Sequence, residues 1–87
     1  MSIENKYYEK AIEDFNKVIE LDPGHADARY LCAIAYMMLK KYDDARLSLR
    51  EAQNLYKKQG DKRGKEIIDL YWERLDILEK REKEDVS

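Results

Sequence analysis

The fold is decided by residues 26–58, which read ADARYLCAIAYMMLKKYDDARLSLREAQNLYKK. Residues 26–39 are apolar on nearly every side, which indicates a helix that other elements cover on several faces. Residues 42–58 instead carry an apolar stripe at helical spacing. Aspartates at the start of that stripe and lysines at its end complement a helix dipole. The segment therefore predicts two consecutive helices, the first of them central and the second amphipathic.

Helices are also predicted on both sides of this segment. Residues 5–21 carry apolar residues at i, i+3, i+4 and i+7, as an amphipathic helix does. The Asp-Pro-Gly-His turn at residues 22–25 ends that helix, because proline cannot continue it and glycine accepts a left-handed cap. Gly60 ends the helix over 42–58, and Asp61 is the predicted N-cap of a last helix over residues 62–84.

The sequence resembles itself after a shift of 34 residues. The matches fall on the apolar stripe and pair Tyr8 with Tyr42, Ala11 with Ala45, Phe15 with Leu49, Val18 with Ala52 and Leu21 with Leu55. Self-similarity at such a period is typical of helical repeat proteins.

Composition excludes several classes of protein. A chain of 87 residues allows one domain, predicted over residues 1–87. It contains no apolar run near the ~18 residues that a membrane span requires. A net charge of −2 gives no electrostatic case for nucleic acid or an anionic membrane as partner. The single cysteine, Cys32, cannot form an internal disulfide, and with one histidine it provides no structural zinc site. We therefore expect a cytoplasmic protein without metal or cofactor.

These residues resemble the tetratricopeptide repeat, a 34-residue helix–turn–helix unit. Residues 8–23 look like the second helix of one repeat, with Ala11, Phe15 and the closing Pro23 at the motif positions. Residues 26–58 look like a full repeat, with Ala33 at the small-residue place and Tyr36 at the aromatic place. The resemblance implies an all-α, antiparallel stack of about four helices, a fragment of an α-α superhelix.

Two residues depart from the family pattern. Arg29 stands where the family usually has tryptophan, and Lys57 replaces the closing proline. In the predicted organisation, residues 5–21 are the second helix of an incomplete repeat and residues 26–58 are a full repeat. Residues 62–84 are then either a capping helix or the first helix of a third repeat.

An incomplete first repeat leaves apolar surface without a covering helix, and burying that surface is favourable. We expect another copy to fill this place by helix exchange, which makes a homo-oligomer the second functional hypothesis. A fragment or a designed piece of a longer repeat array would explain the same pattern. The predicted assembly surface comprises Tyr8, Ala11, Phe15, Tyr71, Trp72 and Leu75.

The first functional hypothesis is a non-catalytic module that binds a peptide or helix of a partner protein. By the resemblance, the ligand-facing places fall on Asp27, Tyr30, Ile34, Met37 and Met38. Methionines suit an apolar groove because they adapt to varied partners. The competing interpretation is that these side chains simply pack on the helix over 62–84.

No catalytic residues are predicted. His25 has no paired nucleophile or acid, and the neighbouring carboxylates Glu13 and Asp14 do not face each other on a helix. The carboxylate clamp of some tetratricopeptide proteins is not expected, because Leu31 and Ile34 occupy its asparagine places. The inventory of side chains therefore favours binding over catalysis.

Overall fold

The computed structural model describes residues 3–85. They form four consecutive helices, α1 (Ile3–Leu21), α2 (Ala26–Met38), α3 (Tyr42–Gln59) and α4 (Lys62–Asp85). The prediction of an all-α stack of antiparallel helices is confirmed, and no strand occurs within residues 3–85. Each helix begins and ends within two residues of the position that periodicity and turn residues predict.

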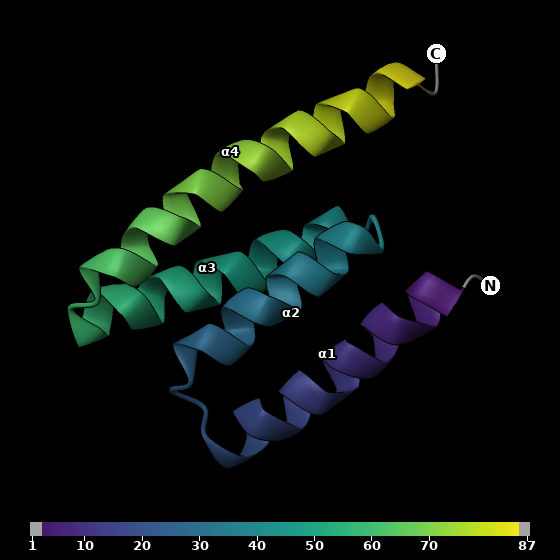
Figure 1. The fold of residues 1–87 in the computed structure, drawn as a ribbon. Helices are drawn as coiled ribbons and strands as arrows, with labels where there is room; N and C mark the ends of the chain where they lie inside the picture. The colour runs from purple at the N-terminus through teal and green to yellow at the C-terminus, as the bar shows by residue number, and fades with distance from the viewer. Residues whose placement is uncertain (1–2, 86–87) are drawn as a thin grey trace.

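The helices stack side by side in chain order (Figure 1). Helix α2 packs against both α1 and α3, and α4 packs against α3. Figure 1 shows α1 and α4 on opposite sides of the α2–α3 pair. The described chain extends over 42 × 26 × 16 Å, so the stack is thin and α2 has neighbours on both flanks.

The core runs along the contact between α2, α3 and α4. Alanines at Ala33, Ala45 and Ala52 are fully buried and let the helix backbones approach closely. The large side chains that fill the remaining space are Leu49, Met37, Tyr56, Ile68 and Leu75. This core therefore depends on α4 as much as on the α2–α3 hairpin.

Side chains cap two of the helices. His25 Nδ1 accepts a hydrogen bond from the Ala28 N–H at 3.0 Å, so this histidine is the N-cap of α2. Asp61 Oδ1 accepts from the Gly64 N–H at 2.8 Å, which confirms the predicted cap of α4. The left-handed glycine is Gly60, with φ of 68°, at the end of α3. The expectation of such a cap at Gly24 was wrong, since Gly24 does not adopt a positive φ.

Helix α1 is the least covered element, because α2 is the helix it packs against. None of its described side chains is fully buried. Tyr7 and Val18 are exposed, and so is Leu21 at its end. Across residues 3–85, no helix is both long and apolar enough to pass through a lipid bilayer.

Candidate functional site

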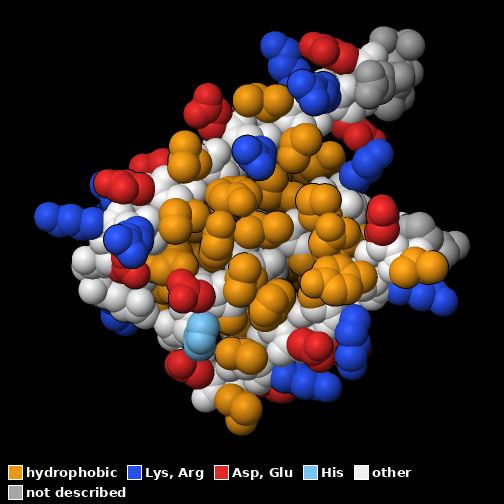
Figure 2. All heavy atoms as spheres, in the orientation of Figure 1, with side chains coloured by type: hydrophobic (Ala, Val, Ile, Leu, Met, Phe, Trp, Pro, Cys, Tyr) orange, Lys and Arg blue, Asp and Glu red, His pale blue; other side chains and the backbone are white. Residues whose placement is uncertain are grey.

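A cavity of about 830 Å³ lies between α2 and α4, and we call it the trough. Its lining residues are Ile34, Met37, Met38, Leu70, Tyr71, Glu73, Arg74, Ile77, Leu78 and Arg81. Three apolar side chains there stay exposed, Met38 by 53%, Leu70 by 65% and Ile77 by 50%. Figure 2 shows a continuous apolar surface over α1, α2 and α4 on this face, with charged side chains around its edge. The trough therefore combines a concave shape with exposed apolar side chains.

Helix α2 contributes one side of the trough through residues at i, i+3 and i+4. These are Ile34, Met37 and Met38, which lie on one face of the helix. Met37 is buried in the core, whereas Met38 points to solvent. Three of the five predicted binding residues thus line one cavity.

The other two predicted binding residues make contacts within the chain. The Tyr30 ring packs edge-to-face on Tyr71 with centroids 5.3 Å apart. Burial, followed by the hydrogen bond and charge of Tyr71, raises the pKa of Tyr30 well above its ordinary value. Asp27 accepts a hydrogen bond from the Tyr56 hydroxyl. Tyr30 and Asp27 therefore hold α2 against α4 and α3 at one end of the trough.

Helix α4 contributes the second side, of which the sequence analysis named Tyr71 alone, as part of the assembly surface. Residues 70, 74, 77 and 81 line the trough at spacings of four, three and four. The same spacing continues toward the start of α4, so that the full stripe comprises Arg63, Ile67, Leu70, Arg74, Ile77 and Arg81. This spacing is the signal from which the second side of the trough could have been predicted. The arginines within the stripe conceal its apolar character.

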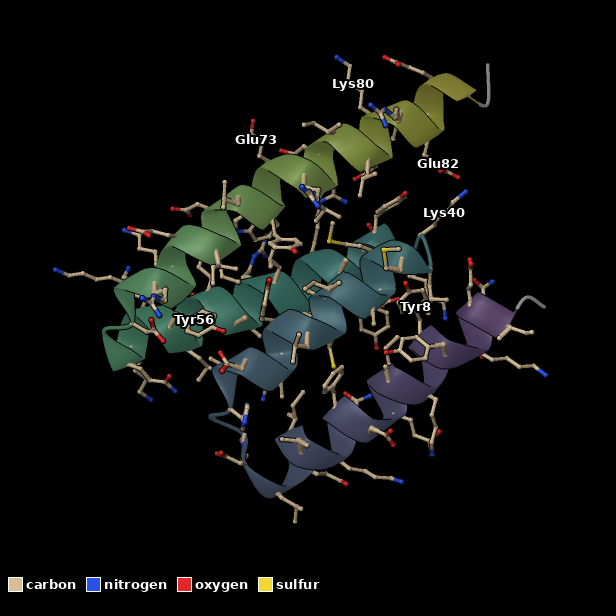
Figure 3. All side chains as sticks on the ribbon, viewed as in Figure 1. Tyr8, Lys40, Tyr56, Glu73, Lys80 and Glu82 are labelled. Atoms are coloured by element: carbon tan, nitrogen blue, oxygen red, sulfur yellow. The ribbon has the colours of Figure 1, made fainter. Side chains whose placement is uncertain are left out.

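Two arginines supply the charge of the trough. The Arg74 guanidinium lies 5.7 Å from the centroid of the Tyr71 ring, a cation–π contact. Within residues 3–85, neither Arg74 nor Arg81 forms an ion pair. Glu73 also lines the cavity, but Figure 3 shows its carboxylate directed away from α2. The trough therefore presents two unpaired positive charges beside exposed apolar side chains.

An ion pair joins the turn after α2 to α4 near the trough. Lys40 Nζ lies 3.6 Å from Glu82 Oε2, and the two side chains point toward one another in Figure 3. This pair links the turn after α2 to the last part of α4. It is exposed, so its contribution to stability is small.

The predicted assembly residues fall into two groups. Tyr8, Ala11 and Phe15 are half-buried on the side of α1 that faces α2, as Figure 3 shows for Tyr8. Three others, Tyr71, Trp72 and Leu75, pack within the same chain. Leu75 is fully buried, Tyr71 contacts Tyr30, and Trp72 Nε1 donates to Gln53 Oε1 at 3.3 Å. In this structure, α4 lies on its own chain.

The arginine that replaces the family's tryptophan has partners of its own. Arg29 Nη1 lies 2.6 Å from Glu51 Oε2, and Nη2 donates to the Pro23 carbonyl at 3.1 Å. Its side chain is 19% exposed. Arg29 therefore ties the turn after α1 to α3 by polar contacts where a tryptophan would do so by packing.

The described residues offer little that could support chemistry. No group of three metal-ligating side chains occurs within residues 3–85. Burial raises the pKa of the Cys32 thiol, which keeps the thiol protonated and weakly nucleophilic. The arrangement is suited to holding another chain against apolar surface.

Consecutive antiparallel helices with a concave apolar face define the class of helical repeat proteins. A family model of the tetratricopeptide repeat matches residues 2–61, more than half of the chain. The chain therefore belongs to the tetratricopeptide repeat family, as its resemblance predicted. Membership in this family suggests a protein–protein interaction module, and the family is generally non-enzymatic.

Comparison with individual proteins adds one relative. An uncharacterized protein of Methanocaldococcus jannaschii is 50% identical over 38 residues, which are 44% of each of the two chains. The match thus spans less than half of that relative. No solved structure matches the chain significantly.

Proposed function

We propose that this chain is a non-catalytic binding module that holds a peptide or helix of a partner protein in the trough. The observation that supports this most is the exposure of Met38, Leu70 and Ile77 around one cavity. Burial of one such side chain contributes about 1.5–3 kcal/mol of transfer free energy. The cost of association consumes part of that gain, so three side chains together support a moderate affinity.

The proposal is tested with a displayed library of amphipathic 18-residue helices and flexible peptides, selected on the wild-type protein. Affinities of enriched peptides are then measured by titration calorimetry against Met38→Glu. Met38 is the position of choice because it is exposed, whereas a charge at the buried Met37 would disturb the core. The matched control is Leu47→Glu on α3, which is 60% exposed and does not line the trough.

The expected result is that Met38→Glu weakens peptide binding at least ~10-fold while Leu47→Glu leaves it within about twofold. Circular dichroism verifies that both variants remain helical. Enriched peptides that bind both variants as well as the wild type would overturn the assignment of the trough. A selection that enriches no peptide would overturn it as well.

A second candidate function is self-assembly, and α1 carries the observation that favours it. Residues 3, 7, 10, 14, 17 and 21 alternate by four and three along its less covered side. Two such stripes placed antiparallel bring Ile3 opposite Leu21 of the second copy and Lys10 opposite Asp14. In the single chain, Lys10 lies 3.6 Å from its own Asp14 in an exposed pair that is free to exchange partners.

Light scattering at two protein concentrations tenfold apart tests this candidate. A two-fold dimer should be present at the higher concentration. Lys10→Asp should dissociate it by placing two carboxylates opposite each other, and Lys10→Asp/Asp14→Lys should restore it. A wild-type protein that stays monomeric at both concentrations, or a dimer indifferent to the single exchange, would refute pairing through α1.

A further inference from the structure

We propose that the occupant of the trough is an amphipathic helix that carries acidic residues seven positions apart within its apolar stripe. This inference rests on the proposed function and names the chemistry of the partner. It is supported by the spacing of the α4 stripe and by the two unpaired arginines within it.

The spacing of the stripe indicates that the occupant is helical. Alternation of four and three residues along α4 is the period at which two helices stay in contact while they pack at about 20° to each other. An extended peptide projects side chains every second residue and does not follow such a stripe. Leu70 and Ile77, two turns apart, would each receive an apolar residue of the incoming helix.

The volume of the trough leaves room for side chains of an incoming helix. Its volume of about 830 Å³ is open to solvent along α2 and α4, and Met38 faces it from the opposite side. A helix seated there would contact α4 through the stripe and α2 through Ile34 and Met38. Methionine at this contact accommodates side chains of several shapes.

The charge of the trough defines which polar residues the helix carries. Arg74 and Arg81 are seven residues apart, which is about 10.5 Å along a helix axis. A partner helix beside α4 presents its own residues at the same interval, so carboxylates seven apart would meet both guanidiniums. Planar guanidinium groups bind carboxylates with two parallel hydrogen bonds.

Two acidic residues near the trough, Glu82 and Glu73, do not pair with these arginines. Glu82 is paired with Lys40 at 3.6 Å, and the Glu73 carboxylate points away from α2. The Arg74 guanidinium carbon lies 5.7 Å from the centroid of the Tyr71 ring, and a cation–π contact of this kind consumes none of the five N–H donors of arginine in an ion pair. The site therefore favours an acidic over a neutral helix, and a neutral over a basic one.

The test uses three synthetic 18-residue helices that differ only at two positions seven apart. The parent is a helix enriched on the wild-type trough, and the two positions carry Glu, Gln or Lys. Calorimetry at low ionic strength should give the Glu helix an affinity about 5–10-fold higher than the Gln helix, with the Lys helix weakest. Added salt should reduce the difference between Glu and Gln.

Arg74→Gln/Arg81→Gln should bring the affinities for the Glu and Gln helices within about twofold of each other. The matched control is Lys65→Gln/Lys80→Gln, which makes the same change of charge at two exposed positions of α4 outside the trough. This control should retain the preference for Glu. Circular dichroism of both variants verifies that α4 remains folded.

Three outcomes would overturn the inference. One is equal binding of the Glu and Gln helices to the wild type. Another is that the selection enriches proline-containing peptides that cannot form a helix. The third is that light scattering detects a dimer that Met38→Glu dissociates, because a second copy would then occupy the trough. If the Glu and Gln helices bind equally well and Met38→Glu still abolishes binding, this inference fails but the proposed function stands. If Met38→Glu does not affect helix binding, the proposed function itself is contradicted.

Discussion

The ring of Tyr56 lies directly against the backbone of Gly64, so that a Cβ atom at position 64 would overlap the ring. The Tyr56 hydroxyl at the same time donates a hydrogen bond to Asp27 on α2. One side chain of α3 thus contacts both helices that form the trough. The separation of α2 and α4 at this end depends on the absence of a side chain at Gly64.

We expect Gly64→Ala to destabilise the fold by about 1–2 kcal/mol. Overpacking against a ring held in place costs about 1–3 kcal/mol, and the higher helix propensity of alanine returns up to about 1 kcal/mol. Urea unfolding measures the change. Gly24→Ala is the matched control, because its nearest neighbouring atom would be 3.8 Å away. A stability equal to the wild type for Gly64→Ala would show that the ring yields.

Two leucines of α3 should respond very differently to truncation. Leu49 is fully buried, whereas Leu47, two residues earlier, is 60% exposed. Leu49→Ala should cost about 3 kcal/mol through lost transfer energy and a residual cavity. Leu47→Ala should change stability by less than about 0.5 kcal/mol.

Urea titrations at 10 °C compare the two variants. A domain of this size has a total stability of only about 4–13 kcal/mol. Leu49→Val, with an expected loss of about 1 kcal/mol, keeps the measurement possible if the alanine variant is unfolded. Similar losses at positions 47 and 49 would contradict the assignment of the core.

Alkaline pH should unfold the protein through two tyrosines. Burial raises the pKa of Tyr30 and of Tyr56 well above the ordinary value near 10, and hydrogen bonds to Tyr71 and Asp27 add to this effect. As pH rises, the two tyrosines therefore lose their protons at a lower pH in the unfolded chain than in the folded protein. The free energy of unfolding is thus fully present below pH ~10 and decreases as pH rises above it. The slope is at most about 1.4 kcal/mol per pH unit for each tyrosine.

Urea midpoints between pH 9 and 11.5 test this dependence. Tyr30→Phe/Tyr56→Phe should flatten the decrease, whereas Tyr7→Phe, at a side chain that is 69% exposed, should leave it as in the wild type. A decrease equally steep in the double variant would assign the alkaline transition to other groups.

Arg29 should not tolerate the exchange for lysine. Its Nη1 pairs with Glu51 while Nε and Nη2 both reach the Pro23 carbonyl, a geometry that an ammonium group cannot reproduce. Arg29→Lys should cost about 1 kcal/mol, and a double-mutant cycle with Glu51→Gln should show coupling of about 0.5–1 kcal/mol. The control is Arg50→Lys at an exposed position of α3. Equal stability of the Arg29 and Arg50 variants would show that the contacts around Pro23 contribute nothing.

Half of the trough could be predicted from the sequence. Ile34, Met37 and Met38 follow from the apolar character of residues 26–39 and from the family resemblance. The α4 side could not be recognised, because Arg74 and Arg81 interrupt its apolar stripe and the fit of that helix to the repeat is loose. Whether the trough binds a partner stays a prediction, as does the assembly surface.

The sequence by itself determined the four helices, their order and their family, because periodicity, caps and turn residues act over a few neighbouring positions. Only the tertiary structure decided which face of α4 packs on α3 and which lines the trough. Packing against α3, including the contact of Gly64 with Tyr56, sets the rotation of α4 about its own axis. Because of this rotation, Tyr71 contacts Tyr30 and Leu75 lies in the core. The same rotation directs Leu70, Arg74 and Ile77 into the trough, and the four-and-three spacing along α4 does not specify this rotation by itself.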